Sequence, residues 1–105
     1  MMKVLFAASE CVPIVKTGGL ADVCGALPRE FDKEEWDVRV VLPNYSCIPE
    51  QWRDQFEYVT HFYMGAGPYI PEKYVGVLTC QYRGITYYFI DNQEYFNTFL
   101  PYGDI

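Results

Sequence analysis

The residues best suited to chemistry form one short run, Lys16-Thr17-Gly18-Gly19-Leu20-Ala21-Asp22-Val23. Two adjacent glycines allow a positive φ and let backbone amides come close to a ligand. The start of a helix offers unpaired amides and a partial positive charge to a phosphate, and Lys16 adds a full cation beside them. At the carboxyl edge of a parallel sheet, where open α/β folds bind ligands, such a run is suited to hold a diphosphate.

Neither of two common phosphate motifs, GxGxxG and GxxxxGK[ST], occurs in the sequence. From the residues alone, a plain strand-to-helix turn explains the glycines as well as a binding loop does. Glu10 and Asp22 flank the run, and each has two interpretations. In one interpretation both side chains face a ligand cleft. In the other, Glu10 is a solvated loop carboxylate, and Asp22 is an acidic residue that interacts favourably with the helix dipole in the first turn.

The elements around this run are predicted in the order strand, helix, strand. Residues 3–9 are an almost continuous apolar stretch, typical of a parallel strand buried on both faces, and residues 10–16 contain Pro13 and read as a loop. The next residues repeat at helical spacing, and Pro28 predicts a kink or break near Ala26. The predicted buried face of this helix consists of Leu20, Val23, Cys24, Leu27 and Phe31. Residues 37–43 are rich in β-branched side chains and predict a parallel second strand.

The second half of the chain predicts antiparallel strands. Residues 75–82 and 85–90 flank Arg83-Gly84, a two-residue link suited to a tight hairpin. Residues 49–56 predict a short helix, residues 58–64 predict a further antiparallel strand, and residues 93–105 show no clear period. The expected fold class is therefore α/β, Rossmann-like, with a parallel strand-helix-strand start followed by an antiparallel hairpin.

Length and composition exclude several classes of protein. The chain has 105 residues, half of them apolar, and a net charge of −6, which favours one domain with a real core and argues against nucleic acid or an anionic membrane as a partner. The apolar stretches are far shorter than the roughly 20 residues that span a bilayer, and the start does not resemble a signal peptide, so we expect a cytoplasmic protein. The four cysteines form no CxxC pair, which favours free buried thiols over disulfides or zinc. We expect no metal site.

Several stretches, taken together, resemble the amino terminus of bacterial glycogen synthases and plant starch synthases. They are Ala8-Ser9-Glu10, residues 16–23, Gly25-Ala26-Leu27-Pro28, residues 37–43, Tyr74-Val75-Gly76-Val77 and residues 88–92. The resemblance implies the glycosyltransferase-B fold, with two Rossmann-like domains and the active site between them. It also implies a retaining enzyme that transfers glucose from ADP-glucose to the non-reducing end of an α-1,4-glucan, without a cofactor.

The resemblance also implies roles for individual residues. Lys16 matches the family lysine that contacts the sugar nucleotide, and Gly18 and Gly19 match the backbone that lines its diphosphate. Tyr95 lies where the family has an aromatic residue near the sugar cleft, although a core position explains it equally. The family usually continues Tyr-Phe with Asp-Arg-Pro, whereas this chain has Asn97-Thr98-Phe99 after Phe96.

By this resemblance, residues 1–105 form part of an amino-terminal domain, and the carboxy-terminal nucleotide-binding domain is absent. The family's catalytic histidine, its phosphate-binding arginine and lysine, and its carboxylate near the transferred glucose would lie beyond Ile105. We therefore expect no catalytic residue in this chain, no activity of the chain alone, and self-association through an uncovered apolar face. Two alternatives stay open: a non-catalytic Rossmann-like binding module, and a glycosyltransferase that uses another sugar nucleotide.

Overall fold

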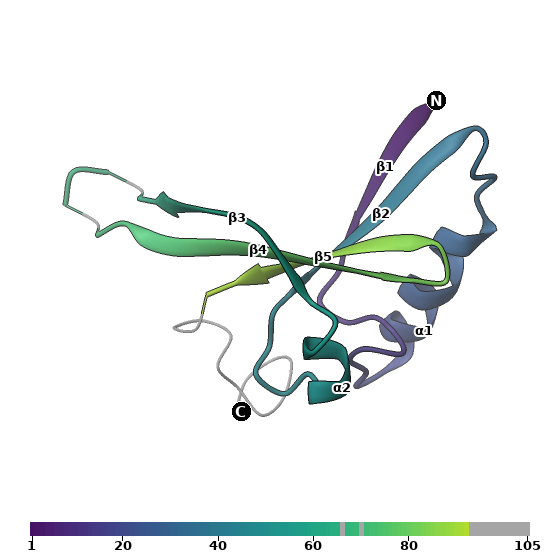
Figure 1. Cartoon of the computed structure of the whole chain (residues 1–105), viewed down its shortest axis with the longest axis horizontal. Coiled ribbons are helices and arrows are strands. Elements are labelled where there is room, and N and C mark those ends of the chain that lie inside the picture. Colours follow the sequence, from purple (N-terminus) through teal and green to yellow (C-terminus); the bar gives the residue numbers. More distant parts are fainter. Residues whose placement is uncertain (66, 70, 93–105) are drawn as a thin grey trace.

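A computed structural model of the chain describes residues 1–65, 67–69 and 71–92. Its elements are β1 (Met2–Ala7), α1 (Gly19–Ala26), the 3₁₀ helix η1 (Leu27–Glu30), β2 (Trp36–Pro43), α2 (Glu50–Arg53), β3 (Glu57–Met64), β4 (Lys73–Tyr82) and β5 (Ile85–Asp91). The strands form one twisted sheet in the order β1-β2-β5-β4-β3 (Figure 1). None of the described helices has the length and apolar character needed to cross a membrane.

The pairing of the strands confirms the predicted fold class. β1 pairs with β2 and β2 with β5 in parallel, while β4 pairs antiparallel with both β5 and β3. Arg83 and Gly84 join β4 to β5 with φ values of 50° and 77°. Two consecutive positive φ values match the type of turn whose twist suits a two-residue hairpin. The predicted helix break near Ala26 is also confirmed, because α1 ends there and η1 follows.

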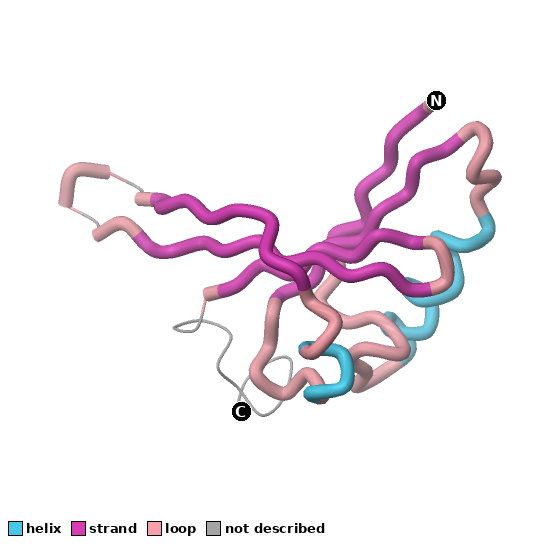
Figure 2. The backbone as a smooth tube through the Cα atoms, in the orientation of Figure 1, coloured by secondary structure: helices cyan, strands magenta, loops and turns pink. Residues whose placement is uncertain are grey.

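The helices among the described residues all lie on one face of the sheet (Figure 2). On this covered face, alternate side chains of β2 and β5 are buried: Val38, Val40, Leu42, Ile85, Tyr87 and Phe89. On the other face, which we call the open face, no described helix packs against the strands. The prediction that the first strand is buried on both faces is wrong, since β1 is an edge strand and its Leu5 side chain is 60% exposed on the open face.

The predicted buried face of the first helix is also wrong in most of its residues. Leu20, Val23 and Leu27 are 48%, 55% and 44% exposed. The buried residues of α1 are Ala21, Cys24 and Gly25, so the prediction is confirmed for Cys24. The small residues face inward because α1 packs closely on the loop before it. A Cβ added to Gly25 would lie 2.7 Å from the carbonyl oxygen of Val12, so only glycine allows this approach.

The β3–β4 hairpin extends past the helices at the far side of the sheet (Figure 1). All eight residues of β3 are exposed, and β3 is the outermost strand on this side. Residues 58–64 contain no Asp, Glu, Lys or Arg. This hairpin confirms the predicted strand at residues 58–64, although it contributes little to the core.

Candidate functional site

The loop between β1 and α1, residues 8–18, leaves the carboxyl end of β1 and leads into the first turn of α1. The loop is anchored by the buried side chains of Cys11 and Ile14 and by backbone hydrogen bonds. The amide of Cys11 donates to the oxygen of Val15 at 2.9 Å, and the amide of Val12 donates to the oxygen of Ala21 at 3.0 Å. The predicted loop is therefore confirmed, and its shape is held by the body of the protein.

Glu10 lies inside this loop and is only 2% exposed, so its interpretation as a solvated carboxylate is wrong. One carboxylate oxygen accepts hydrogen bonds from the hydroxyl and from the amide of Thr17, the latter at 2.9 Å. The other oxygen accepts from the amide of Ala21 in α1 at 3.2 Å. The hydroxyl of Thr17 is the main cause that holds the pKa of Glu10 below its usual range, against the opposing effect of burial, so the side chain is a carboxylate at neutral pH.

Lys16 and Asp22 form an ion pair at the outer surface of the same loop. The Lys16 Nζ atom lies 2.9 Å from both carboxylate oxygens of Asp22, and the two side chains are 51% and 56% exposed. Asp22 lies in the first turn of α1, as one of its two interpretations predicted. An exposed pair of this kind contributes about 0–1 kcal/mol, so a phosphate can take the lysine from Asp22 at little cost.

Gly18 and Gly19 lie at the start of α1, where neither the backbone angles nor the surrounding atoms require glycine. Gly18 is the N-cap residue, with φ of −164°, and neither glycine has a positive φ, which corrects that part of the sequence interpretation. A Cβ on Gly18 would lie 3.8 Å from the nearest Glu10 oxygen, and a Cβ on Gly19 would meet nothing within 4 Å. A Cβ therefore fits at both residues, in ordinary contact with Glu10 at position 18 and in open space at position 19.

The first amides of α1 have no hydrogen-bond partner in the described part of the chain. Within residues 1–65, 67–69 and 71–92, the backbone N–H groups of Gly19 and Leu20 make no hydrogen bond. Unpaired amides at a helix start carry partial positive charge. Together with the exposed ammonium group of Lys16, they make a small cradle suited to an anion.

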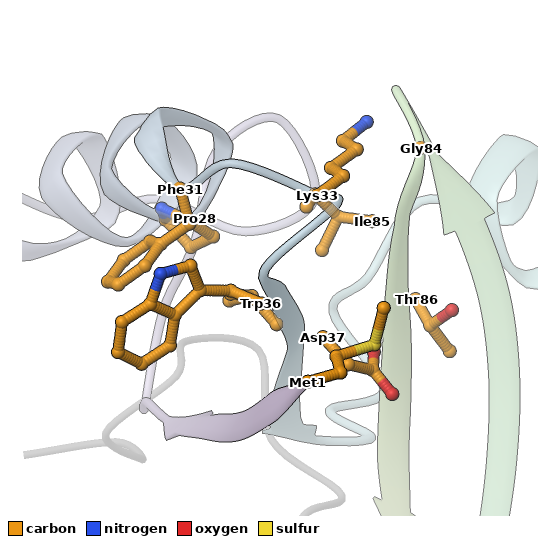
Figure 3. A pocket seen from close by; sticks show the side chains of 10 residues that line it. Met1, Pro28, Phe31, Lys33, Trp36, Asp37, Gly84, Ile85 and Thr86 are labelled. Atoms are coloured by element: carbon orange, nitrogen blue, oxygen red, sulfur yellow. The ribbon is translucent and has the colours of Figure 1, made fainter.

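A hollow lies at each end of the parallel strands. The amino-end hollow, about 280 Å³, has the rings of Phe31 and Trp36 on one wall and Met1, Asp37 and Thr86 on the other (Figure 3). The two rings lie 5.4 Å apart in an edge-on contact, so packing accounts for this wall. The carboxyl-end hollow is wider, about 400 Å³, and is lined by Ala7, Ala8, Ser9, Val41, Leu42, Pro43 and Ile90. It opens beside the start of the β1–α1 loop.

A family model described as the starch synthase catalytic domain matches residues 3–105. The chain belongs to this family. Among curated relatives, the glycogen synthase of Lachnoclostridium phytofermentans is 55% identical over 105 residues, covering 100% of this chain and 22% of the relative. The glycogen synthase of Lachnospira eligens is 51% identical over 103 residues, covering 98% of this chain and 21% of the relative. This member of the starch synthase family thus spans about a fifth of the length of its relatives.

The fold comparison agrees with the family. The catalytic domain of starch synthase IV from Arabidopsis thaliana, described as bound to ADP and acarbose, superimposes with a TM-score of 0.78. The match covers 98% of this chain and 21% of that one, at 24% sequence identity. The mixed sheet with parallel and antiparallel strands is therefore that of a starch synthase catalytic domain.

The structure of this family member brings together five of the six residues singled out in the sequence: Glu10, Lys16, Gly18, Gly19 and Asp22 all lie at the β1–α1 loop or the first turn of α1. Tyr95 and the departure at residues 97–99 lie outside the described residues. Sequence reasoning missed Thr17 and Ala21 as the donors that hold Glu10. No local pattern marked Glu10 as buried, since its neighbours in the sequence are Ser9 and Cys11. Among the described residues, no group of three or more His, Cys, Asp or Glu side chains could hold a metal ion.

Proposed function

We propose that this chain supplies the donor-diphosphate loop of a retaining glucosyltransferase. The enzyme would transfer glucose from ADP-glucose to the non-reducing end of an α-1,4-glucan. Membership of the starch synthase family and identities of 55% and 51% to glycogen synthases support the transfer of glucosyl units. The ADP and acarbose in the description of the Arabidopsis structure support an adenine nucleotide donor and a glucan-like acceptor.

One observation carries the proposed role of the loop: two adjacent glycines begin α1 although the fold has room for a Cβ at both and needs a positive φ at neither. No Cβ clash and no positive φ explains Gly18 or Gly19, and two residues without side chains at a helix start let a ligand approach the backbone closely. The unpaired amides of Gly19 and Leu20 would donate to diphosphate oxygens. Lys16 would leave Asp22 and place its charge on the same group.

This arrangement acts on the leaving group of the proposed reaction. When the bond from the anomeric carbon to the diphosphate breaks, negative charge builds up on the diphosphate oxygens. Fixed amides and an ammonium group aimed at that charge lower the barrier, because they need no reorganisation during the reaction. The acceptor hydroxyl also has to be aligned with the anomeric carbon. We propose that the loop does not supply this second function and that the chain alone is inactive.

The test is a graft into an active relative. The matching 105-residue segment of the L. phytofermentans glycogen synthase would be replaced by this chain, and kinetics would be measured with ADP-glucose and glycogen. Replacing Lys16 with alanine removes a charge-assisted contact, so the KM for ADP-glucose should rise about 10- to 100-fold. Lys33 donates to the Arg83 oxygen at 3.3 Å at the other end of the sheet, and Lys33→Ala serves as the matched control.

The outcomes separate the competing functions. A rise in the donor KM for Lys16→Ala, with unchanged values for Lys33→Ala, would support the proposal. Equal kinetics for both variants would contradict it. A graft that uses UDP-glucose in preference to ADP-glucose would favour another sugar nucleotide, and glucose transfer by the isolated chain would contradict its proposed inactivity.

A further inference from the structure

The N-cap of α1 is unusual because its side-chain acceptor comes from another part of the chain. Ser, Thr, Asp or Asn commonly stands at this position, and its own oxygen accepts from the amide two or three residues on. Here the N-cap residue is Gly18, which has no side chain, and no side chain of the cap itself makes this bond. The amide of Ala21, three residues on, donates to Glu10 Oε1 at 3.2 Å instead.

The same carboxylate also fixes the residue between the lysine and the glycines. The backbone amide and the hydroxyl of Thr17 both donate to the second oxygen of Glu10. Thr17 is directly bonded to Lys16 on one side and to Gly18 on the other. One buried carboxylate therefore holds the helix start and the loop backbone in a single relative position.

Burying the Glu10 carboxylate costs desolvation free energy, and capping of α1 does not by itself require it. Serine at position 18 would cap α1 locally, since the extended backbone of Gly18 accepts any residue and a Cβ there has 3.8 Å of clearance. A serine at position 18 would, however, accept from the amide of Leu20 or Ala21 with its own hydroxyl, and so compete with a ligand for the unpaired amides of Gly19 and Leu20 that begin α1. The remote cap keeps the helix start satisfied and leaves the space before these amides free.

We infer that Glu10 is a positioning residue for the proposed donor site: it caps α1 from the covered side so that Gly18 can stay bare and the amides of Gly19 and Leu20 can face the donor diphosphate. This inference rests on the proposed function. Glu10 touches no ligand in this account and acts through Thr17 and Ala21. Its negative charge is shared among three donors, which limits its repulsion of a diphosphate in front of the loop.

The experiment measures the affinity of the 105-residue chain for ADP by NMR titration in several variants. Glu10→Gln keeps the size of the side chain but turns one acceptor oxygen into a donor, which conflicts with the donors of Thr17 or Ala21. We expect about a tenfold loss of ADP affinity, as for the loss of a hydrogen bond to a charged group. Thr17→Val should also weaken binding, and Thr17→Ser, which keeps the hydroxyl, should restore it.

Two further variants separate positioning from stability. Ile85→Val, at a position 2% exposed at the other end of the sheet, should lower the urea midpoint without changing ADP affinity. Gly18→Ser in the Glu10→Gln background should restore the lost stability through a local cap, yet bind ADP no better than Glu10→Gln alone. The inference therefore predicts that Gly18→Ser raises the stability of the Glu10→Gln variant and leaves its ADP affinity low.

The result that would overturn the inference is a Glu10→Gln chain that is folded and binds ADP as tightly as the unsubstituted chain. Restored ADP affinity in the Gly18→Ser, Glu10→Gln double variant would also overturn it, because stability alone would then explain the effect. Lys16→Ala distinguishes this failure from failure of the proposed function. If Lys16→Ala weakens ADP binding and Glu10→Gln does not, only the inference is wrong. If the unsubstituted chain shows no binding, both are wrong.

Discussion

The two faces of the single sheet differ in how far their apolar side chains are exposed to solvent. On the covered face, Val40, Tyr87 and Phe89 are at most 1% exposed and pack under the helices. On the open face, Leu5, Phe62 and Met64 are 60%, 44% and 60% exposed. Both faces carry apolar side chains, although the open face of β2 also carries the ion pair of Asp37 and Arg39. Apolar side chains on a strand therefore do not by themselves show which face forms the core.

The site lies where the covered face ends. The β1–α1 loop continues from the carboxyl end of β1, and its buried residues Glu10, Cys11 and Ile14 belong to the covered side, whereas Lys16 is half exposed. The loop is thus packed against the protein on one side and accessible on the other. This combination is what a preorganised binding loop needs, since a flexible loop would lose affinity through its ordering.

The largest expected difference between the two faces is in the free energy of unfolding that is lost when a phenylalanine is replaced by alanine. Phe89 is buried and stacked on Phe56 with ring centroids 4.0 Å apart, and Phe89→Ala should lower the free energy of unfolding by about 3–5 kcal/mol. Phe62→Ala on the open face should cost less than about 1 kcal/mol. Urea unfolding followed by fluorescence measures both. Similar costs for the two variants would show that the open face is packed in solution.

A second prediction compares two glycines of the same helix. Gly25→Ala places a Cβ 2.7 Å from the Val12 oxygen, and this overpacking should cost about 1–3 kcal/mol. Gly19→Ala meets nothing within 4 Å and should instead stabilise the chain by about 0.4–1 kcal/mol. Thermal or urea unfolding gives the sign directly. Destabilisation by both substitutions would mean that the space in front of Gly19 is not open.

A third prediction concerns association through the open face. We expect the average mass of the chain to rise with concentration, because an outer strand and the exposed apolar side chains of the open face both favour pairing with a second copy. Sedimentation velocity over a concentration series measures this. Leu5→Lys combined with Phe62→Lys should return the chain to a monomer, whereas Leu27→Lys on the outer side of η1 should not. A chain that stays monomeric at all concentrations would contradict the prediction.

The smallest expected effect is a difference in thiol reactivity. All four cysteines are free, and burial raises the pKa of Cys11 and of Cys80 to about 11. At pH 8 only about one in a thousand of these thiols is a thiolate, the form that reacts. Cys47, which is only partly buried, should therefore react first with iodoacetamide. Mass spectrometry identifies the site, and equal rates in the folded chain would contradict the buried placement of Cys11 and Cys80.

The order and type of the elements were predictable because their signals are local. The Arg83-Gly84 link and the break before Pro28 need no information from elsewhere in the chain. The inward face of α1 was not predictable, because two sets of residues follow helical spacing. One set is Leu20, Val23 and Leu27, and the other, with smaller side chains, is Ala21, Cys24 and Gly25. Only the contact between Gly25 and Val12 decides between them.

The site was predictable in its position and not in its bonding. Lys16, Gly18 and Gly19 are adjacent in sequence, so their shared location follows from the strand-to-helix order. Glu10 reaches Thr17 and Ala21 across 7 and 11 positions, which depends on how the loop folds back on itself. A carboxylate near a loop gives no sign in the sequence that it is buried as a cap.

The most direct test of the central claim asks where ADP binds on the unsubstituted chain. In an amide NMR titration with ADP, the account predicts the largest shifts at Gly18, Gly19 and Leu20, and Lys16→Ala should reduce them. The hollow at the amino end of the parallel strands serves as the internal control, because it is lined by Phe31, Lys33 and Thr86 and carries no proposed role. Shifts concentrated at that hollow, or no shift at the β1–α1 loop, would contradict the account.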